Sequence, residues 1–385
     1  MKKVLHVSRD NKFLDFAINC FEQVNHGQNY YMVIDKDRNK ESVSYVKYES
    51  IHPESLSNAV ELIGTQSFIS QFKAVIFHGI SPVEKQVLDA IQTDIKVIWF
   101  GYGFDYYPLI DFFMLRYLDK KTKKYWYQEK NGLAKIGLRI NELIPFWTFF
   151  KSRNELKSVD RVDYFAPVLK QEYYEIKAKH PGFRAEYIDW NYELGKEIFD
   201  SIGQEFATGK NFLVGNSASI TNNHLDCFSL LTPQIIGSNK VLVPLSYGFP
   251  KRFKNIIKSE AKSRFKEKFE PLEEFIPFHD YLSRLKSCGY ALFGSIRQQA
   301  LGNIYMCLAL GIKVYLHPDN PILDELRNQG FHLFDFNQLK NESPAERPLP
   351  ETQKKENREL MRQMSLKENY LQKTKNLISL IDSFE

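Results

Sequence analysis

Short apolar runs alternate with stretches of helically spaced apolar residues along the first half of the chain. The runs are typical of buried strands, and the stretches between them are typical of amphipathic helices. Strands are expected at residues 4–8, 30–34, 43–48, 74–80, 96–103, 162–168 and 185–189. Helices are expected at residues 11–24, 55–66, 81–91 and 169–180. Strands that alternate with helices form parallel sheets covered on both faces, so we predict an α/β, Rossmann-like domain at residues 1–190.

The same alternation returns in the second half, after a polar helical connector at residues 191–209. Strands are expected at residues 211–217, 240–248, 290–293 and 313–316, and helices at residues 224–231, 252–269, 278–288 and 301–310. We therefore predict a second Rossmann-like domain at residues 210–341. A charged helical tail is expected at residues 342–385, with a packing stripe formed by Leu366, Tyr370, Leu377 and Leu380.

The stretch at residues 278–321 carries the most distinctive chemistry. A turn at residues 294–299 leads into an apolar helix that is expected to be buried and to end at Gly311. The free N–H groups and the positive dipole end of this helix, together with Arg297, suit a phosphate or diphosphate. Because a turn of this kind is more often ordinary helix capping, the pattern alone leaves both interpretations open.

Length, charge and cysteine content indicate the number of domains and the cellular compartment. The chain has 385 residues, which fits two domains, and a formal net charge of +5. Its four cysteines lack metal-ligand spacing and lie in apolar helical contexts, so we expect reduced thiols in a reducing compartment. The first apolar run is too short for a signal sequence, and no run is long enough to span a bilayer. We expect a cytoplasmic protein whose membrane contact is peripheral.

The positive charge is concentrated at residues 115–158, called here the basic segment. Eleven Lys and Arg against four Asp and Glu give this segment +7, so the rest of the chain is slightly acidic. Aromatic and aliphatic residues are interleaved with the lysines, as in a helix that lies on an anionic bilayer. A solvated basic face over an ordinary core helix explains the same pattern. Nucleic-acid binding is disfavoured because no nucleic-acid module is recognisable.

Several segments carry a family resemblance. They are HVSRD, FHGI and WFGYGFDYYPL in the first half, and LVGNSASITNNHLDCFSLL, VLVPLSYGFP, FHDYLSRLKSC, IRQQALGNIYMCLALGI and HPDNP in the second. Together they resemble the bacterial 4-acetamido-4,6-dideoxygalactose (Fuc4NAc) transferases, which are glycosyltransferases of family 56. The resemblance implies the two-domain GT-B fold, with the nucleotide-sugar donor in the second domain and a lipid-diphosphate-linked saccharide acceptor in the first. It also implies a role in bacterial surface polysaccharide synthesis at the inner face of the cell membrane.

The predicted donor site combines strand ends with the turn before the apolar helix. Small and amide residues at the end of a strand let the backbone approach a phosphate and donate hydrogen bonds to it. The donor, a dTDP- or UDP-linked sugar, is expected to contact Gly215, Asn216, Ser217, Tyr247, Arg297, Gln298, Gln299, Gly302, Asn303 and Asn320. GxGxxG, Walker A and DxD motifs are missing, so we expect no dinucleotide, P-loop or metal cofactor. The chain departs from the family at Ala300 and Leu301, which replace a Gly-Ile pair, and at His279, which replaces an acid.

The predicted acceptor site lies where strands of the first domain end. His6, Gly79, Gly101 and Gly103 are expected to contact the acceptor, and Asp105 or His78 to take the proton from its hydroxyl. Each of these residues also has a purely structural explanation, because a lone His is often a satisfied core residue and Asp105 can be a helix N-cap. Two rival functions stay open: a non-catalytic nucleotide-sugar-binding protein of a polysaccharide assembly complex, and a GT-B-like nucleotide-sugar 2-epimerase.

Overall fold

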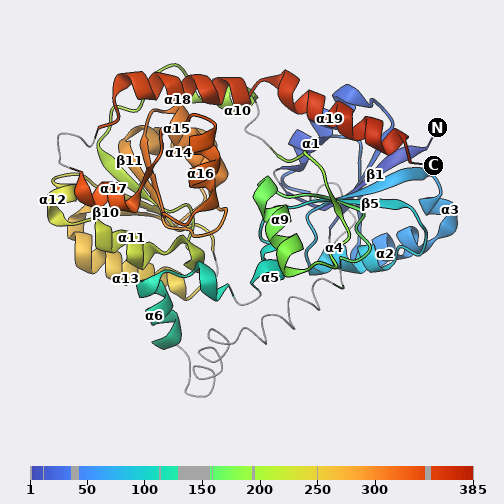
Figure 1. Ribbon diagram of the computed structural model, residues 1–385, viewed down its shortest axis with the longest axis horizontal. Coiled ribbons are helices and arrows are strands. Elements are labelled where there is room, and N and C mark those ends of the chain that lie inside the picture. Colours follow the sequence, from blue (N-terminus) through green and yellow to red (C-terminus); the bar gives the residue numbers. More distant parts are fainter. Residues whose placement is uncertain are drawn as a thin grey trace. The chain divides into compact units, whose positions relative to one another are not determined.

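A computed structural model of the chain shows two compact units (Figure 1). The first unit comprises Met1–Phe113, Pro145–Glu193 and Lys367–Glu385, and the second comprises Met114–Ile144 and Leu194–Leu366. The structure describes residues 2–11, 13–35, 43–111, 114–128, 157, 159–192, 196–248, 250–342 and 348–384.

The first unit is built on a seven-stranded parallel sheet in the order β3-β2-β1-β4-β5-β6-β7. The strands are β1 (Lys3–Arg9), β2 (Asn29–Ile34), β3 (Ile51–Glu54), β4 (Phe72–His78), β5 (Lys96–Phe100), β6 (Tyr164–Ala166) and β7 (Glu186–Tyr187). The central strands β1, β4 and β5 are almost entirely buried, as expected for a parallel sheet covered on both faces. Because all the strands run the same way, their carboxyl ends share one rim.

The helices of this unit follow the predicted order. They are α1 (Leu14–Val24), α2 (Leu56–Gly64), α3 (Gln66–Ile69), α4 (Pro82–Asp89), α5 (Tyr107–Ile110), α9 (Lys170–Lys179) and α19 (Lys367–Asp382). Ser81 is the N-cap of α4: its hydroxyl accepts from the main chain, and Glu84 at the third position completes a capping box.

Helix α19 brings the end of the chain into the core of the first unit. It packs beside α1 (Figure 1), where Tyr370 and Leu377 are buried and Leu380 is partly buried against the same core. Three of the four residues of the predicted stripe therefore contact this unit. The predicted single tail is divided, since α18 (Glu351–Met364) belongs to the second unit and packs on α15. Ser365 closes α18 by donating its hydroxyl to the Arg362 carbonyl, and α19 starts two residues later.

The second unit is built on a six-stranded parallel sheet in the order β10-β9-β8-β11-β12-β13. The strands are β8 (Asn211–Val214), β9 (Val241–Pro244), β10 (Phe269–Leu272), β11 (Cys288–Phe293), β12 (Lys313–Leu316) and β13 (Phe334–Asp335). The helices are α6 (Lys120–Gln128), α10 (Lys196–Ile202), α11 (His224–Leu230), α12 (Pro233–Ile236), α13 (Phe253–Phe265), α14 (Phe278–Lys286), α15 (Leu301–Ala309), α16 (Pro321–Asn328) and α17 (Phe336–Asn341), with α18. Short 3₁₀ turns are η2 (Leu115–Tyr117), η3 (Ile220–Asn222) and η4 (Lys266–Lys268).

The strand predicted at residues 43–48 is wrong, and the third strand lies instead at Ile51–Glu54. The main-chain N–H groups of residues 44–46 donate to the Asp10 carboxylate, and those of residues 47 and 48 donate to Asp15. Because these donors are held by two side chains at the start of α1, they are not available to a strand ladder.

Residues 115–128 of the basic segment belong to the second unit, not to the first as predicted, whereas Lys157 belongs to the first. Helix α6 lies beside α11 and α13 (Figure 1). The rest of the basic segment, apart from Lys157, lies outside the described residues. Among the helices that the structure describes, none is long and apolar enough to cross a bilayer.

Candidate functional site

Three loops at the carboxyl rim of the second sheet meet at Asn216. This residue follows β8 through Gly215, whose φ of +68° is a left-handed conformation that glycine adopts without strain. The Asn216 amide donates to the Tyr247 hydroxyl at 3.1 Å, and its oxygen accepts from Gln299 at 3.3 Å. The predicted donor residues after β8, β9 and β11 are therefore brought together, as parallel strands require.

A second set of hydrogen bonds holds the loop after β8 and joins it to Gln299. The Thr221 hydroxyl donates to the side-chain amide oxygen of Gln299, Oε1, at 2.7 Å. Ser217 is buried, and its hydroxyl and carbonyl oxygens both accept from the Asn222 amide. Ser217 therefore organises the loop rather than facing open solvent. Thr221 and Asn222 lie in a segment of the family resemblance but were not predicted as site residues. The Gln299 partner of Thr221 is distant in sequence, whereas Asn222 bonds to Ser217 within the same loop.

Asn222 and His224 have buried side-chain atoms that lack hydrogen-bond partners among the described residues. Within the described residues, Asn222 Oδ1 and both ring nitrogens of His224 have no hydrogen-bond partner, although both side chains are fully buried. Burial lowers the pKa of His224 to about 3, so its imidazole is neutral. A Cβ added to Gly215 would lie 2.7 Å from His224 Nε2, which shows how tightly the loop covers the ring.

The turn before α15 holds the predicted phosphate-binding residues. Arg297 is partly buried and donates from Nη1 to the Gln298 carbonyl at 3.0 Å, while the Gln298 side chain is buried. Ala300 precedes the helix at a φ of +66°, which is costly for a residue with a Cβ. A glycine would adopt this conformation without that cost.

Two of the other predicted donor residues, Asn303 and Asn320, have structural partners. Asn303 accepts from the Tyr281 hydroxyl at 2.6 Å, and space is open around Gly302. Asn320 is the N-cap of α16, since its side chain accepts from Ile322 N–H, and it also donates to the Ser295 carbonyl. Asn320 therefore ties the turn after β12 to the turn after β11.

Asn223 and Asp226 fasten the start of the basic segment to this rim. The Asn223 amide donates to the carbonyls of Tyr117 and Gly294, and its oxygen accepts from Asp119 N–H at 2.9 Å. The Asp226 carboxylate accepts from the first turn of α6. Asp119 also lies 3.5 Å from His317, and this imidazole lowers the pKa of the Asp119 carboxyl.

At the rim of the first sheet, the two predicted histidines form a buried pair. His6 Nδ1 lies 2.9 Å from His78 Nε2, and His78 Nδ1 is hydrogen-bonded to the Tyr192 hydroxyl. Burial lowers the pKa of His6 to about 3, and burial together with His6 lowers that of His78, so both rings are neutral. His78 therefore positions Tyr192, and its role as a catalytic base stays a prediction.

Asp105 lies at the same rim, is partly buried, and accepts several hydrogen bonds. Its carboxylate accepts from Trp99 Nε1 at 2.8 Å and from the main-chain N–H groups of Ile80 (3.1 Å) and Tyr102 (2.9 Å). Burial raises the pKa of this carboxyl to about 6, although the three hydrogen bonds favour its ionised form. Asp105 thus fixes two loops, and a carboxyl with such a pKa also suits proton transfer near neutral pH.

The glycines predicted to contact the acceptor have close aromatic neighbours. A Cβ on Gly79 would lie 2.7 Å from the Tyr102 ring, and one on Gly101 would lie 2.6 Å from Tyr106. Gly103 has a φ of +96° in the turn before Asp105. These positions let aromatic rings approach the backbone, and contact with an acceptor stays a prediction.

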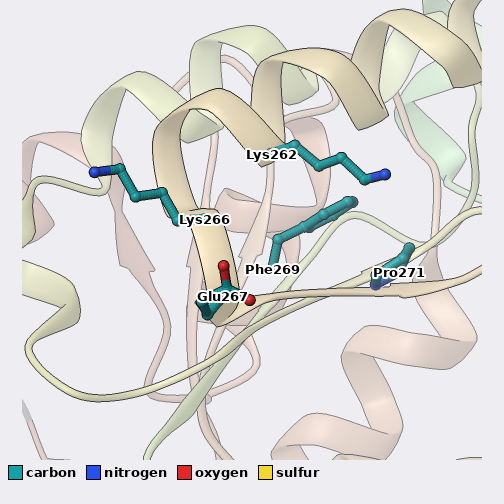
Figure 2. Close-up of a pocket in the computed structure, with 5 residues that line it drawn as sticks. All are labelled: Lys262, Lys266, Glu267, Phe269 and Pro271. Atoms are coloured by element: carbon teal, nitrogen blue, oxygen red, sulfur yellow. The ribbon is translucent and has the colours of Figure 1, made fainter.

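A pocket in the second unit lies away from these loops. Figure 2 shows Lys262 and Lys266, at the end of α13, above Phe269 and Pro271 of β10. Phe269 begins β10, so the pocket lies toward the amino end of that strand and away from the carboxyl rim. We assign it no part in the donor site.

The chain is similar to one protein family and to several solved structures. Residues 194–376 match the family described as 4-alpha-L-fucosyltransferase, glycosyl transferase group 56, which confirms the expected family resemblance. A glycosyltransferase from Rickettsia africae is similar at 12% identity, with a TM-score of 0.60 over 100% of this chain and 99% of that one. Sucrose-phosphate synthase from Thermosynechococcus elongatus is similar at 9% identity and a TM-score of 0.65 over both whole chains. Anabaena HepE, solved with UDP and glucose, is similar at 9% identity and a TM-score of 0.60 over 98% of this chain and 100% of that one. These likenesses confirm the GT-B fold.

Proposed function

We propose that this GT-B glycosyltransferase moves a deoxyamino sugar from a nucleoside-diphosphate donor to a lipid-linked saccharide in bacterial surface polysaccharide synthesis. The observation that carries the proposal is the convergence of Asn216, Tyr247 and Gln299 from three loops on one rim, inside the region that matches the family. That rim is where open α/β sheets bind ligands.

The donor site supplies what a departing diphosphate needs. Negative charge develops on the diphosphate as the anomeric bond breaks, and donors that are already in place stabilise it most effectively. Arg297 and the main-chain N–H groups of the turn before α15 are such donors. We propose dTDP- or UDP-linked sugars as donors and expect no metal cofactor.

The acceptor side of the proposal rests on the rim of the first sheet. A hydroxyl is a poor nucleophile at neutral pH, and a positioned base typically contributes roughly 10²–10⁴-fold to the rate. Asp105, whose pKa is raised to about 6, is the better candidate of the two predicted bases. His78 is less suited because both its ring nitrogens already have partners.

The basic segment is proposed to hold the enzyme at an anionic membrane surface, where a lipid-linked acceptor would be found. Lys120, Lys121 and Lys124 of α6 are exposed, and each basic residue near an anionic surface adds about 1 kcal/mol of attraction. Since α6 is fastened to the second unit, this contact would be made by the unit that binds the donor.

A transfer assay tests the proposal. Purified protein is incubated with dTDP- or UDP-linked deoxyamino sugars and a polyprenyl-diphosphate-linked saccharide, and the lipid product is measured by mass spectrometry. We expect a product heavier by one sugar, and loss of turnover with intact donor binding in Asp105→Asn. Donor binding without any transfer would instead support a non-catalytic binding protein. Interconversion of the donor sugar at C2 would support an epimerase.

A further inference from the structure

Four aromatic residues gather at the carboxyl rim of the first sheet. Phe13 follows β1, Tyr102 and Phe104 follow β5, and Tyr192 follows β7; together they are called here the aromatic platform. Tyr102 lies at its centre, with ring centroids 4.9 Å from Tyr192, 5.5 Å from Phe13 and 6.0 Å from Phe104. The rings of Tyr192, Tyr102 and Phe104 are nearly parallel, with interplanar angles of 17° and 6° between successive pairs.

Phe104 and Phe13 of the platform are exposed, whereas Tyr192 and Tyr102 are held by hydrogen bonds. Phe104 is 53% exposed and Phe13 is 42% exposed, which is unusual for side chains of this size. The Tyr192 hydroxyl is held by His78, and the main chain of Tyr102 is held by Asp105. The Tyr192 side chain and the Tyr102 main chain are therefore held before any ligand arrives, which reduces the conformational entropy that this part of the platform loses when one binds.

Polar groups border the rings. The Tyr102 hydroxyl donates to Asn11 Oδ1 at 3.3 Å, so a phenol and an amide lie at the edge of the platform. A sugar ring has an apolar C–H face and hydroxyls around its edge, so a flat aromatic surface with hydrogen-bonding groups beside it is complementary to that ligand. A prenyl chain would instead need an apolar lining without such a polar border.

We infer that the aromatic platform binds a pyranose ring of the acceptor saccharide, stacked on the exposed ring of Phe104 and bordered by Phe13. The inference rests on the proposed function, because that proposal places the acceptor in the first unit. It adds a saccharide subsite formed by Phe104, Phe13 and Tyr102. The stacking is expected to set acceptor affinity rather than donor affinity.

The test uses the full-length protein and needs no donor. Saturation-transfer NMR is recorded with the methyl glycosides of N-acetylglucosamine, N-acetylmannosamine and glucose, and separately with farnesyl phosphate. We expect binding of at least one glycoside. Phe104→Leu, which keeps the apolar volume but removes the ring, should weaken that binding about 3- to 10-fold, whereas Phe104→Tyr should retain it. Tyr174→Ala is the matched control, since this side chain is 56% exposed on α9 of the same unit.

The outcomes separate this inference from the proposed function. Glycoside binding that depends on the ring at residue 104 supports the platform even if no sugar transfer is detected. Three results would overturn it: no glycoside binding to the wild type, equal binding by Phe104→Leu, or binding of farnesyl phosphate alone. Circular dichroism of each variant checks that the fold is kept.

Discussion

The Asp226 carboxylate accepts two hydrogen bonds from Thr122, one from its main-chain N–H at 2.9 Å and one from its hydroxyl at 2.7 Å. Thr122 is fully buried, and the second carboxylate oxygen accepts from Lys121 N–H at 2.7 Å. Asp226 therefore caps α6 from a different helix, about a hundred residues away in sequence. This contact places the lysines of α6 on the second unit.

Replacing Asp226 with Ala should release the first turn of α6. The loss of a cap and of charge-assisted hydrogen bonds is expected to cost about 1–3 kcal/mol, concentrated in residues 117–128. Hydrogen exchange measured by mass spectrometry should show faster exchange there and little change in β8 or β11. Asp280→Ala is the control, because Asp280 is an exposed acid in the first turn of α14. Unchanged protection of residues 117–128 would show that α6 is held in another way.

Ala300→Gly should stabilise the second unit. Ala at the left-handed φ of this position costs about 1–2 kcal/mol, and part of the relief is offset by the greater freedom of Gly in the unfolded chain. We expect a net gain of up to about 1 kcal/mol in the free energy of unfolding, measured by urea denaturation. Ala309→Gly, at a buried position within the same helix, should instead cost about 1 kcal/mol or more. A lower free energy of unfolding in Ala300→Gly would contradict the claim that the backbone of Ala300 is strained.

His224→Leu should change how stability depends on pH. The unfolded chain binds a proton on His224 below about pH 6.5, whereas the folded chain does so only near pH 3, so this group destabilises the fold as pH falls from 6.5 toward 3. Each pH unit below about 6.5 lowers the free energy of unfolding by about 1.4 kcal/mol, so wild type has lost about 2 kcal/mol at pH 5. The free energy of unfolding of the variant, relative to that of wild type, should therefore rise by about 2 kcal/mol between pH 7 and pH 5, measured by urea denaturation.

The control for this prediction is His279→Leu, at a highly exposed histidine of the same unit. Its stability curve should stay parallel to that of wild type. Parallel curves for His224→Leu as well would show that His224 is not a buried neutral imidazole. At pH 7 the variant should be at least as stable as wild type, because it removes buried nitrogens that lack partners among the described residues.

Charge reversal at Lys120, Lys121, Lys123 and Lys124 should abolish co-sedimentation with anionic liposomes at low salt. The expected attraction of about 1 kcal/mol per lysine is screened by salt, so binding by wild type should also fall between about 0.05 and 0.5 M NaCl. The matched control reverses four exposed lysines elsewhere in the unit, Lys251, Lys262, Lys266 and Lys340. If wild type does not bind anionic liposomes, α6 is an ordinary basic face.

The sequence predicted those parts of the fold that depend on local pattern. Continuous apolar runs predicted β5 and β12, and the order of strands and helices predicted two parallel sheets. The strand predicted at residues 43–48 failed because Asp10 and Asp15 hold its main-chain donors, a tertiary effect that no local pattern records. The docking of α6 was missed for the same reason, since its cap comes from a distant helix.

The site was predictable as far as topology determines it. Residues that follow parallel strands must share a rim, which is why Asn216, Tyr247 and Gln299 meet. Hydrogen-bond assignments were not predictable, because they depend on side-chain positions in three dimensions. The bond from His78 to Tyr192 was therefore not foreseen, and neither were the positions of Asn222 and His224; the role of His78 as a base stays a prediction.

The central claim is that the second unit binds a nucleoside diphosphate at the turn before α15. Isothermal titration calorimetry with dTDP, UDP and GDP tests it most directly, on wild type, Arg297→Ala and the control Arg284→Ala, whose guanidinium is exposed and paired with Glu270. We predict that wild type and the control bind at least one of the nucleotides equally, and that Arg297→Ala binds it more weakly by about 1.5–3 kcal/mol, roughly 10- to 150-fold. Unchanged affinity in Arg297→Ala, or no nucleotide binding by wild type, would contradict the account.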